Sequence, residues 1–246
     1  MADTMDLRIK LEPITAQGST EPFAWHAGIH ARRHAFHTVD AILPREDRTA
    51  LEATRLDRVF AAAAAAGLAD SGTLLVVPVQ VRAGTPDRLL AHLFRAALRH
   101  RFPVGHVIVE ISADEATDRD AAAALIHACT DRGMMIALGD FAAGPLALRL
   151  LAHCSPRLIR LAPALAHRLD IAPARARLVE GVLRLAGGMG VAVVAPAPTE
   201  EAEQQAAFAA GLRHFEGELR IEQRVRRYTR PMRRWGAAVA ANRLAA

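Results

Sequence analysis

Cysteine is scarce in this sequence, and so are long hydrophobic runs. The 246 residues contain two cysteines, Cys129 and Cys154, which lack the paired spacing of a metal site or a disulfide framework. Such usage is typical of a reducing compartment. No run reaches the roughly 18 apolar residues of a membrane span, and the acidic start MADTMD has no apolar core for a signal peptide. We therefore expect a cytoplasmic protein without a membrane span.

Lysine and aromatic residues are also rare. Lys10 is the only lysine and aromatic residues make up 4% of the chain, so the net charge of +5 rests on arginine. A nucleic-acid-binding surface requires clustered basic residues. The arginines cluster only at the C-terminal end, so we expect no nucleic-acid partner. We interpret this end as a solvated tail; the alternative is contact with an acidic partner or a nucleotide. The cluster comprises Arg220, Arg224, Arg226, Arg227, Arg230, Arg233 and Arg234, interleaved with Tyr228 and Trp235.

Common catalytic motifs are missing. The chain has no G-x-S-x-G elbow, no Walker loop, no H-E-x-x-H and no C-x-x-C, which excludes the chemistry that those motifs support. Gly188 and Gly190 follow a predicted helix and precede a predicted strand, the reverse of the order in a dinucleotide-binding fingerprint. A histidine metal site is an alternative, but no Cys, Asp or Glu lies among the histidines before Asp40. We interpret them as rim or surface residues: His26, His30, His34 and His37.

Alternating strand and helix patterns dominate the chain. With 246 residues, 52% of them hydrophobic, it is long enough for one large core and matches the roughly 250 residues of a (β/α)8 barrel. From Val107 to Ala162, short aliphatic runs alternate with helix-period segments, which predicts βαβ units and a parallel sheet. Beyond it, a helix over 174–186 leads into the strand VAVVA, and a last strand lies near HFEGEL. We predict a single α/β domain, with its core at 7–219 and a tail at 220–246.

The beginning of the chain departs from an ordinary barrel. Apolar and polar residues alternate from Leu7 to Glu12, and a second strand follows the turn AQGSTEP, so the first two of eight strands should form an antiparallel hairpin. A helix is expected over 39–66. The next strand should end near Pro78, because proline cannot donate a ladder hydrogen bond. Thr85 and Thr199 are expected to cap the helices that follow them.

Ionisable residues end three of the predicted strands. Glu110, Asp140 and Arg160 each lie at or just past the C-terminal end of a strand, the edge where parallel α/β barrels collect functional groups. One interpretation is that Glu110 and Arg160 form an ion pair on nearby strands while Asp140 caps the following helix. The alternative is that these side chains contact a ligand.

The order of short motifs resembles that of a known family. An antiparallel first pair, then EIS, GDF, IRL, VVA and FEG, occurs in the order of the EAL-domain family, the cyclic di-GMP phosphodiesterases. The resemblance covers roughly Leu7 to Leu219. It implies a modified TIM (β/α)8 barrel with one antiparallel strand. It also implies phosphodiester hydrolysis by two divalent metals, which carboxylates and an asparagine hold.

The first half of the family's site residues is largely replaced here. The glutamate of the EAL signature falls on His26, and the arginine of that signature falls on His30. The asparagine ligand on the next strand falls on Pro78, which has no polar side-chain atom. The following glutamate ligand is retained as Glu110, whereas the second glutamate of its motif is Ala113.

The second half shows the same loss. The paired aspartates of the D-D-F-G motif fall on Gly139 and Asp140, so one survives. The lysine of the K-x-D motif becomes Arg160, and its aspartate becomes Ala162. The later E-G-V-E segment reads Pro196-Ala197-Pro198, and the glutamine of the Q-G motif is Glu216.

The surviving carboxylates are too few to hold a pair of hard cations, which require near-octahedral oxygen ligands. Arginine cannot release a proton near neutral pH, so it cannot replace a base. Loss of several ligands that act together should remove the metal-dependent rate. We therefore predict no phosphodiesterase activity, no bound metal and no cofactor. The remnant pocket would consist of His26, His30, Glu110, Asp140, Arg160 and Glu216.

Two functions remain as hypotheses. The first is a catalytically inactive EAL-like domain that acts as a regulatory protein-binding module in cyclic di-GMP-related signalling. The alternative is a cyclic di-GMP receptor without hydrolysis, in which Arg160 contacts phosphate; His30, in place of the signature arginine, weighs against it. An unrelated barrel enzyme lacks a complete acid–base constellation. The resemblance also implies a homodimer contact through Phe141–Leu148, a segment that is equally suited to the core.

Overall fold

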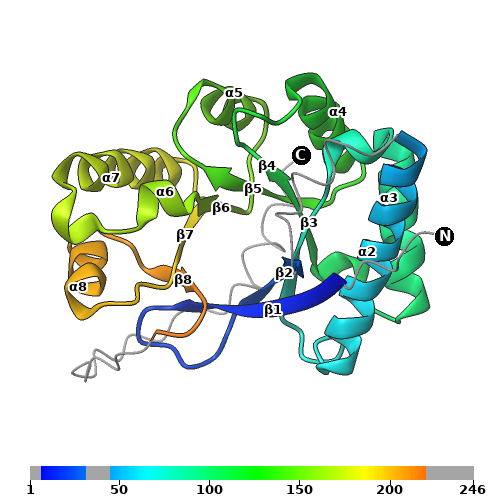
Figure 1. Ribbon diagram of the computed structural model, residues 1–246, viewed down its shortest axis with the longest axis horizontal. Helices are drawn as coiled ribbons and strands as arrows, with labels where there is room; N and C mark the ends of the chain where they lie inside the picture. Colours follow the sequence, from blue (N-terminus) through cyan, green and yellow to red (C-terminus); the bar gives the residue numbers. More distant parts are fainter. Residues whose placement is uncertain (1–6, 32–44, 220–246) are drawn as a thin grey trace, which may run out of the picture.

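Eight strands close into a barrel in the order of the chain (Figure 1). In the computed structural model, the backbone is described for residues 7–31 and 45–219, and side chains for 8–28 and 47–219. β1 runs antiparallel to both of its neighbours, β2 and β8, and every other neighbouring pair is parallel. The predicted modified barrel with one antiparallel strand is confirmed. The strands are β1 (Leu7–Ala16), β2 (Ala24–Ala31), β3 (Leu74–Pro78), β4 (Val107–Ser112), β5 (Met135–Phe141), β6 (Leu158–Leu161), β7 (Ala192–Pro196) and β8 (His214–Glu216).

Helices surround the barrel on the sides formed by the parallel strands (Figure 1). Within the described part of the chain, no helix is long and apolar enough to cross a membrane. Short 3₁₀ turns lie at Val81–Ala83, Val104–His106 and Leu169–Ile171. The helices are α2 (Arg45–Ala65), α3 (Pro86–Arg99), α4 (Arg119–Thr130), α5 (Pro145–His153), α6 (Pro163–Ala166), α7 (Pro173–Gly188) and α8 (Glu201–Ala209).

The core has two parts because side chains alternate between the two faces of each strand. The larger part fills the space between the strands and the helices. The smaller part fills the inside of the barrel below its mouth with aliphatic side chains from β1 to β7, so the barrel interior is packed rather than open. This inner layer consists of Ile14, Ala24, Val76, Ile108, Ala137, Leu158, Ala192 and Val194.

The predicted ends of β3, α2 and α3 can be compared with the described residues. Pro78 is the last residue of β3, as predicted. The helix expected over 39–66 is described as α2 from Arg45, and residues 39–44 lie outside the described part of the chain. Thr85 occupies the N-cap of α3, although its side chain makes no capping hydrogen bond. The arginine cluster at 220–234, His34 and His37 also lie outside the described residues.

The predicted cap of α8 by Thr199 is wrong. Glu200 is the N-cap residue, and Glu203, one turn into the helix, reaches back to the loop instead. The Glu203 carboxylate accepts hydrogen bonds from the backbone N–H of Arg168 (2.7 Å) and of Thr199 (3.2 Å), and it lies 3.2 Å from Nδ1 of His167. A glutamate in the first turn can satisfy N–H groups ahead of a helix as well as a threonine can. Glu203 thereby joins two loops that sequence alone does not place together.

We expect Glu203→Gln to lower the free energy of unfolding by about 1–3 kcal/mol, because buried charge-assisted hydrogen bonds are lost. Burial opposes the charge on Glu203, but the surrounding donors still lower its pKa below the usual 4.5. The stabilisation is therefore present above pH 4.5 and is lost as pH falls through the lowered pKa. Urea unfolding at neutral pH and at successively lower pH values below 4.5 should show the wild type converging on the variant. A difference that grows in acid would contradict this assignment.

Candidate functional site

The candidate site is the layer of side chains next to the packed inner layer, at the C-terminal ends of the parallel strands. We call this end of the barrel its mouth. On each parallel strand it is reached by moving two residues toward the C-terminal end: Ile108 leads to Glu110, and Leu158 leads to Arg160. β1 runs the other way, so Ile14 leads back to Glu12, which pairs in register with His26. The eight mouth positions are Glu12, His26, Pro78, Glu110, Gly139, Arg160, Pro196 and Glu216.

Glu110 and Arg160 form a bidentate ion pair in the centre of the mouth. Arg160 Nε donates to Glu110 Oε2 at 3.1 Å, and Nη2 donates to Oε1 at 3.0 Å. The Glu110 side chain is 3% exposed and that of Arg160 is 13% exposed. Burial disfavours both charges, yet each partner stabilises the other, so the pKa of Glu110 is lowered and the pKa of Arg160 is raised. The ion pair predicted from the sequence is confirmed.

His26 supplies a second positive charge to the same layer. Its Nδ1 lies 2.8 Å from Glu216 Oε1, and its Nε2 lies 3.5 Å from Glu110 Oε1. Neither ring nitrogen meets hydrogen-bond geometry, so both contacts are ion pairs rather than aligned hydrogen bonds. Burial opposes protonation, but Glu110 and then Glu216 outweigh it and raise the pKa of His26 to about 9. Without a ligand, the imidazole is therefore charged at neutral pH.

Asp140 joins this network from the end of β5. Its Oδ1 accepts from Arg160 Nη2 at 3.2 Å, and its Oδ2 accepts from Ser112 Oγ at 3.1 Å. The expectation that Asp140 caps the next helix is wrong: Glu115 accepts from the N–H of Leu146 in α5 at 2.9 Å. Asp140 has a φ of +49° beside the register shift between β5 and β6, and this left-handed backbone turns its carboxylate toward Arg160.

The pair of divalent metals that the resemblance implies does not fit these side chains. Both oxygens of Glu110 are engaged by Arg160, and Pro78 offers no side-chain ligand. A Cβ at Gly139 would lie 2.4 Å from Glu110 Oε1, so no carboxylate fits at that position unless Glu110 moves. Paired catalytic ions lie about 3.5–4 Å apart and need bridging oxygens. The Arg160 guanidinium already occupies both Glu110 oxygens, which such ions would need as ligands.

The structure brings together five of the six predicted pocket residues, namely His26, Glu110, Asp140, Arg160 and Glu216. His30 lies on β2 opposite Arg8, and its side chain is outside the described set. Sequence reasoning missed Glu12. The antiparallel register of β1 with β2 was the available signal, because it places Glu12 opposite His26.

The segment expected to form a homodimer contact belongs mostly to the core. Phe141, Leu146 and Ala147 are buried, whereas Leu148 is exposed. These side chains pack between β5, α5 and their neighbours. A homodimer through this segment therefore stays a prediction; it would use Leu148, the largest exposed apolar side chain of the segment, and would compete with any other partner for that side chain.

We expect Arg160→Met to lower the free energy of unfolding by about 3–5 kcal/mol, because Glu110 would lose its main partner while remaining buried. The double variant Glu110→Leu/Arg160→Met should recover most of this loss, since it removes both charges. Urea denaturation followed by circular dichroism measures both. A loss below about 1 kcal/mol in the single variant, the value typical of exposed pairs, would show that Glu110 is solvated.

Solved structures with the same fold include several EAL proteins. A standalone EAL protein from Vibrio cholerae, in its c-di-GMP-bound form, superposes with a TM-score of 0.73 at 20% identity over 88% of this chain and 91% of that chain. BlrP1 from Klebsiella pneumoniae, in a manganese/cy-diGMP complex, gives 0.74 at 22% identity over 89% of this chain and 56% of that one. The FimX EAL domain of Xanthomonas citri in complex with c-diGMP gives 0.68 at 15% identity, with coverage of 86% and 85%.

These likenesses at low identity establish the fold. No curated protein sequence matches the chain. The family model described as the EAL domain matches residues 12–222. This range begins within β1 and contains β2 to β8 in full. The eight-stranded barrel with β1 reversed agrees with this match. The chain belongs to the EAL domain family.

Proposed function

We propose that this EAL domain does not hydrolyse cyclic di-GMP and that it regulates by binding a partner protein. The observation that carries the proposal is the bidentate contact of Arg160 with Glu110, the one glutamate ligand retained from the family's motifs. An EAL phosphodiesterase needs this carboxylate for metal. In this chain, the Glu110 carboxylate is paired with the Arg160 side chain instead.

The charge balance of the mouth supports the absence of catalysis. Arg160 and His26 face Glu110, Glu216 and Asp140 at 2.8–3.8 Å, so two fixed side-chain cations offset most of the negative charge of the three carboxylates. A hard divalent ion would have to displace a guanidinium held by charge-assisted hydrogen bonds. Gly139 and Pro78 remove two further ligands. Because such ligands act as a unit, their combined loss removes the rate rather than reducing it slightly.

A groove at the opposite end of the barrel offers a surface for a protein partner. Its volume is about 960 Å³, and it lies between α5, α7 and the segments that enter β5, β6 and β7. Leu148, Leu185 and Met189 line it and are 46%, 44% and 38% exposed. Exposed apolar side chains gathered around one hollow are typical of interaction sites. Met134, Met135 and Leu151 also belong to the apolar lining.

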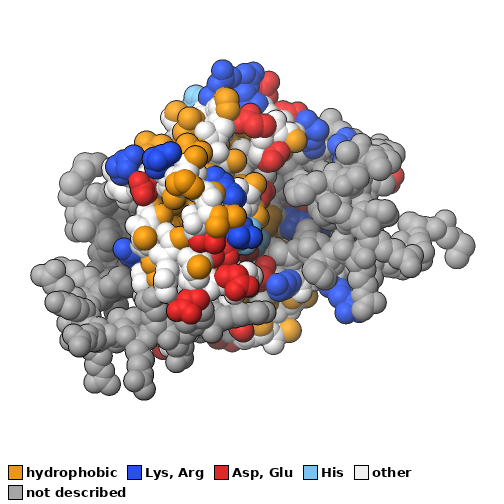
Figure 2. All heavy atoms as spheres, turned by 60° about the vertical axis from the view of Figure 1, so that its left-hand side comes forward, with side chains coloured by type: hydrophobic (Ala, Val, Ile, Leu, Met, Phe, Trp, Pro, Cys, Tyr) orange, Lys and Arg blue, Asp and Glu red, His pale blue; other side chains and the backbone are white. Residues whose placement is uncertain are grey.

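The chemistry of the groove favours one class of occupant. Its charged or titratable lining consists of Arg157 and His153, together with the Cys154 thiol, and includes no carboxylate among the described residues. Figure 2, with the side that carries α7 turned forward, shows hydrophobic side chains interspersed with basic and acidic ones on the upper part of this face. We assign the groove to an amphipathic helix of a partner protein whose apolar face is flanked by Asp or Glu.

The absence of catalysis is tested with cyclic di-GMP and saturating Mg²⁺ or Mn²⁺. We expect no product above a protein-free control under conditions in which an active EAL protein turns over completely. The physical reason is that Arg160 occupies Glu110. Metal-dependent turnover that disappears in Glu110→Gln would contradict the proposal.

Calorimetric titration of the same preparation with cyclic di-GMP addresses the receptor alternative. The relatives whose structures contain cyclic di-GMP make this alternative concrete. Arg160 already contacts three carboxylates, so little positive charge is left for phosphate, and we expect no heat at micromolar nucleotide. Micromolar binding that is abolished in Arg160→Ala would favour the receptor.

Docking in the groove is tested by Leu148→Arg and Leu185→Arg, with Leu98→Arg on α3 as the matched control, because Leu98 is 73% exposed and does not line the groove. A partner captured from the native cell should be retained by wild type and the control but lost by both groove variants. Its purified acidic amphipathic segment should bind each variant at least about tenfold more weakly, a difference of about 1.4 kcal/mol. Self-association that is lost in the groove variants would identify a second copy as the occupant and contradict this proposal.

A further inference from the structure

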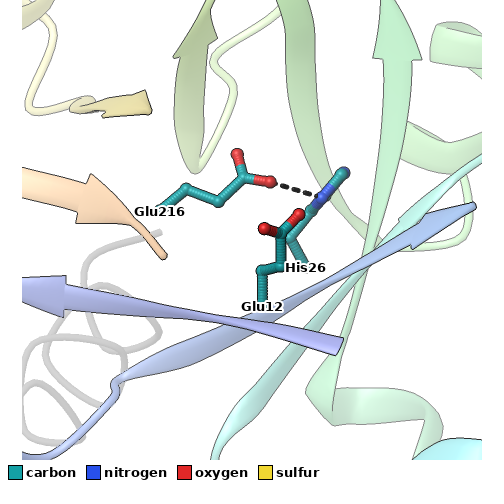
Figure 3. Close-up of side chains that lie close together, drawn as sticks. All are labelled: Glu12, His26 and Glu216. Atoms are coloured by element: carbon teal, nitrogen blue, oxygen red, sulfur yellow. Dashed lines mark ion pairs between the residues drawn. The ribbon is translucent and has the colours of Figure 1, made fainter. Parts of the chain in front are cut away.

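Three side chains from adjacent strands converge at the seam where the barrel closes (Figure 3). Glu12 comes from β1, His26 from β2 and Glu216 from β8. Each offers one ligand atom, and these three atoms lie within 4.8 Å of one another. Metal–ligand bonds to nitrogen and oxygen are about 2.0–2.2 Å long, so donors on one ion lie at most about 4.4 Å apart. A shift of a few tenths of an ångström would therefore let these three atoms share one ion.

The second observation is the state of the imidazole. His26 is 6% exposed, and neither of its buried ring nitrogens makes an aligned hydrogen bond among the described residues; their contacts are the ion pairs with Glu216 and Glu110. Figure 3 shows one ring nitrogen of His26 facing the Glu216 carboxylate, with the Glu12 carboxylate close by. Buried polar atoms are nearly always hydrogen-bonded or ligated, so a buried ring nitrogen that lacks an aligned hydrogen bond and lies beside two carboxylates is suited to bind an ion.

We propose that Glu12, His26 and Glu216 form a binding site for a single divalent transition-metal ion, of which zinc is the best match. One imidazole nitrogen with two carboxylate oxygens suits zinc and its neighbours, whereas magnesium and calcium prefer all-oxygen sites. Nδ1 of His26, the atom 2.8 Å from Glu216 Oε1, is the ligand nitrogen. Binding releases the proton that this nitrogen carries in the free protein.

The surroundings match those of a metal-bound histidine. Nε2 of His26 faces Glu110 Oε1 at 3.5 Å, so a small shift would let this ring nitrogen donate to a carboxylate, as metal-bound histidines commonly do. Lys10 Nζ donates to Glu12 Oε1 at 2.6 Å, so the other oxygen of Glu12 remains for the ion. Arg160 Nε lies 3.8 Å from Glu216 Oε2, which leaves Oε1 on the side of His26.

This site goes beyond the proposed function and does not depend on it. One ion bound by these three residues is not the catalytic pair, because Arg160 still occupies Glu110. Its effect would be structural. β1 and β8 share only the register Ile14↔Glu216, Thr15↔Phe215 and Ala16↔His214, and an ion held by β1, β2 and β8 would fasten this short seam.

The test is a titration of the full chain, freed of metal with a chelator, with Zn²⁺ alone. Calorimetry should show one site per chain with micromolar or tighter affinity, and saturating Zn²⁺ should raise Tm by about 5 °C. Glu12→Gln and Glu216→Gln should each weaken binding at least about 10–100-fold. Asp140→Asn is the matched control: it removes a carboxylate from the same mouth but not from the site, and it should change affinity less than about threefold.

Cobalt gives an independent reading on the wild-type chain, which needs no variant to fold. One Co²⁺ per chain should produce the visible d–d absorption of a four- or five-coordinate site, and Zn²⁺ should abolish it. The proposal is overturned if no such band appears. It is equally overturned if Zn²⁺ binds with unchanged affinity to Glu12→Gln, because exposed histidines elsewhere would then be the ligands. Glu12 is partly exposed, so this variant is expected to keep the fold.

Discussion

A buried carboxylate at the centre of a barrel mouth demands positive charge, and in this protein Arg160 provides it. Glu110 is almost fully buried and would be strongly destabilising if left alone. The surrounding residues accommodate the pairing: Gly139 leaves room for the Glu110 carboxylate, and the left-handed backbone at Asp140 directs a second acid to the guanidinium. Side chains here supply positive charge where the family's enzymes use metal, and this is the basis of our proposal that the domain does not hydrolyse cyclic di-GMP.

The barrel beneath this network is closely packed. Aliphatic residues from seven strands fill the barrel interior, and the helices cover it from outside. This packing does not involve the side chains at the mouth. The apolar groove lies at the other end of the barrel, where the strands begin, so a partner could bind there without contacting the mouth. This separation makes a regulatory protein-binding domain physically consistent with a closed, well-packed barrel.

Much of this architecture follows from the sequence. Alternation in β1, the aliphatic runs of the parallel strands and the order of short motifs predicted the barrel, its reversed strand and the contact between Glu110 and Arg160. Other features depend on tertiary distances. The cap expected from Thr199 fails because Glu203 reaches back across the loop, and the cap expected from Asp140 fails because Glu115 comes from another loop. Glu12 was overlooked because its importance depends on the register of β1 against β2 rather than on local pattern.

The central claim is that fixed cations occupy the place of the family's paired metals. Electron paramagnetic resonance of the protein with excess Mn²⁺ and cyclic di-GMP tests it most directly, because two ions about 3.5–4 Å apart are spin-coupled. Our account predicts no coupled pair and no more than one tightly bound ion per chain. A spin-coupled manganese pair that forms in the wild type and disappears in Glu110→Gln would contradict it.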